Sequence, residues 1–355
     1  MAQARLTSDL LVGTSKGLFI LRAGDARRVE GPLCDGMGIN HAIGHGNQIW
    51  AAGGGGWHKP GVWRCRSGQW ALSQAGFAPE VQSVWSLARD GGRLLAGTKP
   101  AALYESRDAG ETWAKLPALN ALPGADAWSP GAAGLTLHSI LTDGTGGIWV
   151  GISAAGVFHS PDGGQSWEVR NRRSNRPGPA GDLPRHWEGA EHRREDEIFH
   201  CVHNMAWGEA PGLIYMQNHQ GVYRSRDGAL TWEEVTQGLP STFGFPVAAH
   251  PHEAGTLWTF PLNGDSAGRF PPDGRAAVWR SRDGGESWQG LGEGLPAKDC
   301  FFTVLRQAMA VDAQSAAVYF GTNSGSVFGS TDEGDSWHEF ARHLPTVLSV
   351  EVLAP

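Results

Sequence analysis

Histidine side chains recur at corresponding places along this sequence. The segments beginning at Trp85, His138 and Gln307 all end in Asp five residues later, and we aligned the other repeats on them. Three neutral imidazoles and one side-chain carbonyl suit a divalent transition metal such as Zn or Mn. The alternative is that these side chains line a wet channel and bind water. One aligned position reads His41, Trp85, His138, His203, Pro246, Gln307 and Ser349, and we predict a metal site at His41, His138, His203 and Gln307.

Further polar and aromatic side chains are expected on the same face. His219 is the predicted general base or an added metal ligand, and Arg306, the neighbour of Gln307, is a second catalytic candidate. The predicted substrate-binding residues are Trp85, Trp187 and Asn218.

A repeated motif, Ser-x-Asp-x-Gly-x-Ser/Thr-Trp, indicates the strands and turns that must position these residues. The five copies start 54, 65, 56 and 49 residues apart, a spacing typical of propeller blades. Asp and Ser side chains bond nearby backbone groups and stabilise a turn, and the closing Trp is expected to pack between sheets. We predict a folding role and no catalytic role for them. The copies begin at Ser106, Ser160, Ser225, Ser281 and Ser330.

Each motif follows three predicted strands, so we expect an all-β chain with seven four-stranded blades, residues 1–355 forming a single propeller. The C-terminal strand at 346–353 should complete the blade begun by residues 10–21 and close the ring. The motif joins the third and fourth strands, so it lies on the bottom face, and the inner strands start at the top. Residues 171–197 form a long top-face insertion, either a lid over the channel or a solvated surface loop.

Composition excludes several classes of partner. The net charge of −7 leaves no basic surplus for nucleic acid, and no apolar run is long enough for a membrane span. The apolar run near residues 10–13 is too short for a signal peptide, so we expect none, and the four cysteines form no CxxC pair. We therefore expect a cytoplasmic protein.

The repeated motif resembles the Asp box, or BNR repeat, of sialidase-like propellers, including bacterial proteins labelled exo-α-sialidase or BNR-repeat glycosyl hydrolase. Sialidases hold a carboxylate with three Arg and use a Tyr–Glu pair. The four tyrosines here lie at repeat positions, so we do not expect sialidase activity. A similar propeller acts in photosystem II assembly without catalysis. By chemical analogy alone, the ligand set resembles the three His and one Gln that hold manganese in cytoplasmic oligogalacturonate lyases.

The function predicted from these residues is a metal-dependent hydrolase of an ester or phosphoester, acting on a small-molecule or oligosaccharide substrate. Two alternatives use the same face. One is a metal-assisted lyase of oligouronates or a glycoside hydrolase, and the other is a non-catalytic propeller that docks a protein partner.

Overall fold

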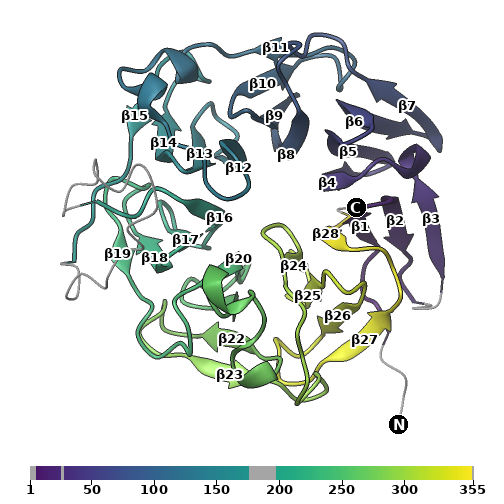
Figure 1. Cartoon of the computed structure of the whole chain (residues 1–355), viewed down its shortest axis with the longest axis vertical. Helices are drawn as coiled ribbons and strands as arrows, with labels where there is room; N and C mark the ends of the chain where they lie inside the picture. Colours follow the sequence, from purple (N-terminus) through teal and green to yellow (C-terminus); the bar gives the residue numbers. More distant parts are fainter. Residues whose placement is uncertain (1–4, 25–27, 176–196, 354–355) are drawn as a thin grey trace.

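The computed structural model is a seven-bladed β-propeller, described here for residues 5–24, 28–175 and 197–353. Seven four-stranded antiparallel sheets stand around a central axis (Figure 1). The closing blade is β28 (Val347–Val352), β1 (Leu10–Thr14), β2 (Gly17–Leu21) and β3 (Val29–Leu33). Because β28 pairs with β1, the two ends of the chain share one sheet, as predicted.

The other six blades are meanders of consecutive strands. They are β4 (Ile39–His45), β5 (Gln48–Gly55), β6 (His58–Arg66) and β7 (Gln69–Ser73); β8 (Ser83–Asp90), β9 (Arg93–Lys99), β10 (Leu103–Ser106) and β11 (Ala114–Lys115); β12 (Thr136–Thr142), β13 (Ile148–Ser153), β14 (Gly156–Ser160) and β15 (Glu168–Val169); β16 (Val202–Trp207), β17 (Ile214–Asn218), β18 (Gly221–Ser225) and β19 (Glu233–Glu234); β20 (Gly244–Ala249), β21 (Leu257–Pro261), β22 (Val278–Ser281) and β23 (Gln289–Leu291); and β24 (Met309–Val311), β25 (Val318–Gly321), β26 (Val327–Ser330) and β27 (His338–Ala341).

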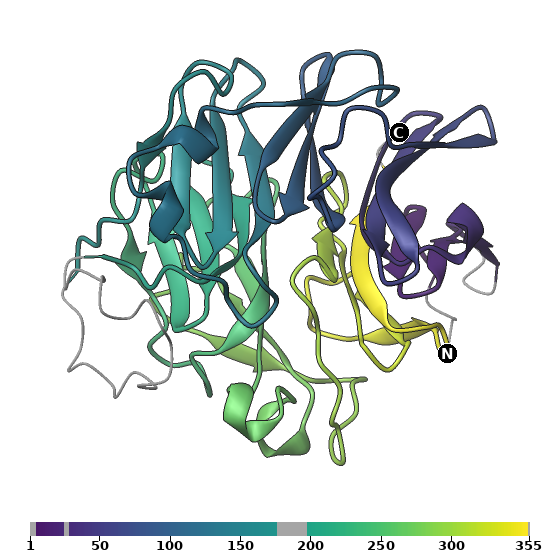
Figure 2. The same ribbon diagram turned by 45° about the horizontal axis from the view of Figure 1, so that its top comes forward.

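Short 3₁₀ turns complete the described structure. They are η1 (Cys34–Gly36), η2 (Leu119–Ala121), η3 (Ala125–Ala127), η5 (Asp265–Ala267) and η6 (Pro272–Gly274). In the oblique view, the green segment that carries η5 and η6 projects from one face of the ring (Figure 2). None of the helical segments in these ranges is long and apolar enough to cross a bilayer.

The repeated motif builds the turns between the third and outer strands. In the first copy the Asp108 carboxylate accepts bonds from the Ser106 hydroxyl at 2.7 Å and the Thr112 hydroxyl at 2.6 Å. The closing Trp113 is 3% exposed, and Trp232 of a later copy is fully buried. Trp232 also donates its indole N–H to the Arg170 carbonyl of the preceding blade at 2.7 Å. The motif therefore stabilises turns and joins neighbouring blades, as the sequence predicts.

Candidate functional site

A bulge in the inner strands decides which side chains share a level around the axis. In β8, β12 and β16 the register shifts by one residue, and the unpaired residue is Trp85, His138 or His203. In β4 the shift falls between Ile39 and His41, so the unpaired residue there is Asn40. The alignment of His41 with His138 and His203 was therefore wrong by one residue.

His41 instead occupies the paired position that follows the bulge, the position of Ser86 in β8. Its Nδ1 accepts the backbone N–H of Leu87 at 3.0 Å. In the neutral ring Nε2 must then carry the proton, and it faces the Glu351 carboxylate at 3.8 Å. His41 thus links three blades and has no ring lone pair left for a metal in this arrangement.

The Gln307 side chain contacts the backbone of His138, and not its imidazole ring. The Gln307 amide donates to the carbonyl oxygen of His138. The His138 ring is fully buried, lies edge-on to Trp85 at 5.3 Å between centroids, and has no hydrogen-bond partner on either nitrogen in the described structure. Burial, and then the charge of Arg306, hold the pKa of His138 well below its usual value, so the ring is neutral.

His203 is oriented as a metal ligand would be. Its Nδ1–H donates to the Gly244 carbonyl at 2.6 Å, which leaves the Nε2 lone pair available. Nε2 lies 3.5 Å from the Sγ of Cys201, and the ring packs 4.8 Å from Phe245. Burial is the main reason that the pKa of His203 lies well below its usual value. Sequence reasoning missed Cys201, although it lies two residues from His203, because the cysteines were examined only for CxxC pairs.

We call Cys201, His203 and His219 the Cys-His-His cluster. One ligand atom from each lies within 4.8 Å of the other two. His219 follows β17, and its backbone N–H donates to the Cys201 carbonyl at 3.0 Å, which ties the two loops together. The His219 Nε2 lies 3.9 Å from the carboxylate of Asp265 in η5. Residues from three different loops thus converge at the top face.

One other group of this kind occurs in the described residues: His250, Glu253 and Glu333. The Nδ1 of His250 accepts the His252 N–H at 3.0 Å, so its Nε2 carries the proton. Arg282 pairs with Glu253 at 3.3 Å and with Glu333 at 2.7 Å. Both carboxylates of this group are therefore already paired with an arginine.

Two more predicted residues border the Cys-His-His cluster. The Arg306 guanidinium carbon lies 4.5 Å above the Phe245 ring. The side-chain amide of Asn218 donates to the Phe199 carbonyl, and its oxygen accepts the Gln220 N–H at 3.1 Å, so Asn218 shapes the loop that presents His219. Trp187 and most of the 171–197 insertion lie outside the described residues, so its predicted lid role and that of Trp187 stay predictions.

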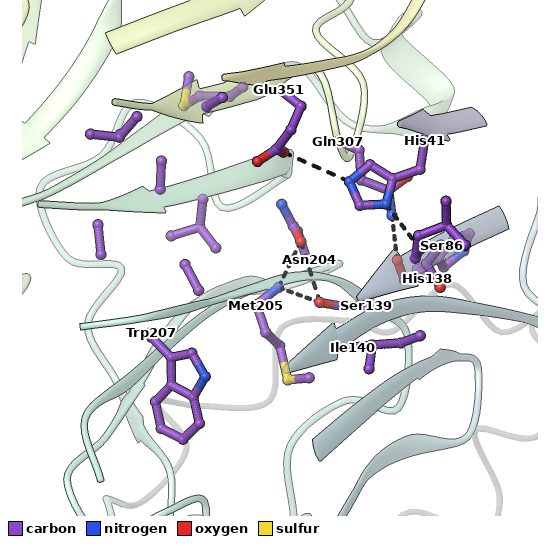
Figure 3. Close-up of a pocket in the computed structure, with 18 residues that line it drawn as sticks. His41, Ser86, His138, Ser139, Ile140, Asn204, Met205, Trp207, Gln307 and Glu351 are labelled. Atoms are coloured by element: carbon purple, nitrogen blue, oxygen red, sulfur yellow. Dashed lines mark hydrogen bonds and ion pairs between the residues drawn. The ribbon is translucent and has the colours of Figure 1, made fainter. Parts of the chain in front are cut away.

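A cavity of about 250 Å³ occupies the channel itself (Figure 3). His41, Asn204, Gln307 and Glu351 line it, and the ends of the inner strands, such as Trp207, form its lower wall. The predicted ligands therefore divide. His41, His138 and Gln307 border this lower cavity, whereas His203 joins the cluster above it.

Comparisons with known proteins agree on the fold. A GH74 xyloglucanase from Xanthomonas campestris superposes with a TM-score of 0.63 at 19% identity, covering 94% of this chain and 52% of that one. A GH74 enzyme from Niastella koreensis matches with a TM-score of 0.56 at 13% identity, covering 94% and 64%. YCF48 bound to a D1 peptide matches with a TM-score of 0.57 at 15% identity, covering 85% and 81%.

This chain thus spans about half the length of the Xanthomonas enzyme. No protein-family model matches the sequence. A search of curated proteins likewise finds no match. At these identities the structural likeness establishes the β-propeller fold alone, and not the sialidase-like family.

Proposed function

We propose that this propeller is a metal-dependent hydrolase whose metal is held by Cys201, His203 and His219. The convergence of these three ligand atoms within 4.8 Å carries the proposal. Of the four ligands predicted from the sequence, His203 is retained. His219, predicted as a general base or an added ligand, takes the ligand role, and Cys201 is new. A thiolate with two imidazoles favours zinc over manganese, which prefers oxygen ligands.

The separations suit such a centre. In a tetrahedral site with Zn–S of about 2.3 Å and Zn–N of about 2.0 Å, sulfur and nitrogen lie about 3.5 Å apart. The Cys201 Sγ and His203 Nε2 are separated by 3.5 Å. The outer groups also fit, because metal-bound histidines usually donate their second N–H to a carbonyl or carboxylate. His203 donates to Gly244, and Asp265 lies beside His219.

Three protein ligands leave one position open, which is typical of catalytic rather than structural zinc. A bound metal would lower the pKa of a coordinated water to about 7. Among this chain's own residues, Gly244 fixes the tautomer of His203, and Phe243 and Phe245 exclude water from one side of its ring. Asp265 would hold His219 in orientation and accept a hydrogen bond from its ring N–H.

Glycoside hydrolysis is the second candidate, favoured by the likeness to the GH74 enzymes. That reaction uses two carboxyl groups on opposite sides of the scissile bond. The Asp265 carboxylate lies 3.9 Å from the His219 ring, and Arg269 pairs with it at 2.5 Å. The structural comparisons thus favour glycoside hydrolysis, whereas the proposal of metal-assisted hydrolysis rests on the Cys-His-His cluster alone.

Peptide binding without catalysis is the third candidate. It is favoured by the peptide-bound YCF48, which matches this chain over most of both lengths. A propeller of this kind would need no metal and would bind through surface complementarity alone.

Metal analysis of the purified protein tests the proposal. The wild type should hold close to one equivalent of zinc, and Cys201→Ser and His203→Ala should lose it. His41→Gln is the matched control and should keep the metal, since His41 lies outside the cluster. Less than about a tenth of an equivalent in the wild type, with no activity gained on adding Zn or Mn, would refute the proposal. Loss of metal in His41→Gln would instead restore the site predicted from the sequence.

Activity assays then separate the reaction classes. Metal-dependent turnover of a nitrophenyl ester or a nitrophenyl phosphodiester supports the main proposal. Metal-independent cleavage of xyloglucan oligosaccharides supports the glycoside hydrolase, and unsaturated products from oligouronates support the lyase. Capture of a peptide by metal-free protein supports the docking module.

A further inference from the structure

Arg306 lacks the partner that a charged group in its position normally has. Its Nε is buried without a hydrogen-bond acceptor. No carboxylate of the described residues forms an ion pair with its guanidinium, although Arg269 nearby is paired with Asp265 at 2.5 Å. Burial lowers the pKa of Arg306 to about 10, as expected for a cation removed from water without full compensation.

The surroundings of Arg306 offer aromatic contact but little counter-charge. Its guanidinium carbon lies 4.5 Å over the Phe245 ring, and His203 packs against that same ring at 4.8 Å. His203 and His138 are neutral, because burial lowers the pKa of each. Arg306 is partly buried, so its cation loses part of its hydration, and a ring face offsets only part of that cost. Within residues 5–24, 28–175 and 197–353, Arg306 is therefore a cation without a paired carboxylate, and it lies beside the Cys-His-His cluster.

We propose that Arg306 is the receptor for an oxyanion, a carboxylate or phosphate oxygen pair of the substrate, held next to the Cys-His-His cluster. The planar guanidinium matches both groups through two parallel N–H···O bonds. The neutral His138, whose two ring nitrogens are fully buried and unpartnered, is the neighbouring candidate for a further N–H donor. This inference rests on the proposed function for the reaction, and it narrows the substrate class to anionic molecules.

A hydrogen bond to the backbone of Arg306 holds this residue in place, which suits a role in anion binding. Its carbonyl accepts the Asn204 amide at 2.9 Å from a blade that is not adjacent to its own, and Asn204 also contacts Ser139 of the blade next to it. The backbone of Arg306 is thus held by a non-adjacent blade, while its guanidinium has no paired carboxylate among the described residues. A fixed backbone with an unsatisfied head group is the arrangement expected of a preorganised ligand site.

Anion binding can be measured without any turnover. The probes are sodium phosphate and sodium acetate at constant ionic strength, with sodium chloride as reference, followed by the thermal unfolding midpoint. One or both anions should raise the midpoint of the wild type in a saturable way. Arg306→Gln should weaken the response by at least about tenfold in Kd, the loss expected for charge-assisted hydrogen bonds. Arg107→Gln, whose side chain is 72% exposed, is the control and should respond like the wild type.

The two anions distinguish the sources of the ligand. A response to phosphate alone indicates a phosphoester substrate, and a response to acetate alone indicates a carboxylate. A wild type that responds to neither anion, or an Arg306→Gln variant that responds like the wild type, overturns the inference. Zinc content is measured in every sample. Anion binding in a protein that holds no zinc would leave Arg306 as a receptor and refute the proposed metal function instead.

A second variant tests whether Arg306 contributes to the stability of the fold. Because the guanidinium is unpaired, Arg306→Met should raise the urea midpoint of the anion-free protein. A lower midpoint would mean that Arg306 supports the fold and would also overturn the inference.

Discussion

Replacement of Asp108 by Asn should destabilise the propeller at neutral pH and have a much smaller effect at pH 2. The carboxylate accepts bonds from the hydroxyl and N–H of Thr112 and from the Ser106 hydroxyl. The turn it stabilises also holds the preceding blade, since Trp50 donates to Ala109 at 2.9 Å. The bonds from Thr112 are the main reason that the pKa of Asp108 falls from 3.8 to about 2.

The direction and the size of the change in unfolding free energy follow from that pKa shift. A carboxyl with a lowered folded-state pKa stabilises the protein above its unfolded pKa near 3.8, and this stabilisation is lost as the pH falls towards 2. The full shift would correspond to about 2.4 kcal/mol, and the exposure of Asp108 to solvent reduces the expected effect to about 1 kcal/mol. Urea unfolding of wild type and Asp108→Asn at pH 7, 4 and 2 measures the difference, with Asp126→Asn in the exposed turn η3 as control. A difference that persists unchanged at pH 2 would show that the carboxylate charge is not responsible.

Three further predictions concern the blade contacts and the site. Gly97→Ala should lower the free energy of unfolding in urea by about 1–3 kcal/mol, because the added Cβ would lie 2.8 Å from the Leu137 carbonyl of the next blade. Gly92 has open space around it, so the control variant Gly92→Ala should leave the stability unchanged. Asp265→Asn should weaken zinc binding by about 10–100-fold in a chelator competition, and an unchanged affinity would remove Asp265 from the site. A chelator should lower the thermal midpoint of the wild type but not of Cys201→Ser, and equal shifts in both would place the metal elsewhere.

The fold could be predicted because its signals are local and repeated. Each copy of the motif builds its turn from residues within a few positions of one another, as in Asp108 and Thr112, and depends little on distant contacts. The apolar strand at the C-terminus had no partner among its neighbours, so its pairing with Leu10–Thr14 followed from ring closure.

The candidate site was predicted only in part. His203, His219 and Arg306 were identified because their residue types and their place on the top face pointed to chemistry. His41 was grouped with them through an alignment that assumed regular strands. A bulge adds one residue without changing the apolar pattern around it, so Asn40 and His41 could not be distinguished by sequence. Cys201 lies two residues from His203, but its other neighbours in space, His219 and Ser153, come from other strands, so the sequence does not show that the three ligand atoms meet.

The sequence by itself therefore determined the architecture: the blade-sized repeat, the closure of the ring, and the face on which polar side chains gather. Only the tertiary structure decided which of those side chains meet. The register shift turned His41 toward Leu87 and Glu351, the Gly244 carbonyl set the tautomer of His203, and Arg306 was left unpaired over Phe245. Each of these outcomes depends on contacts between blades, which join residues far apart in the chain and leave no local trace in the sequence.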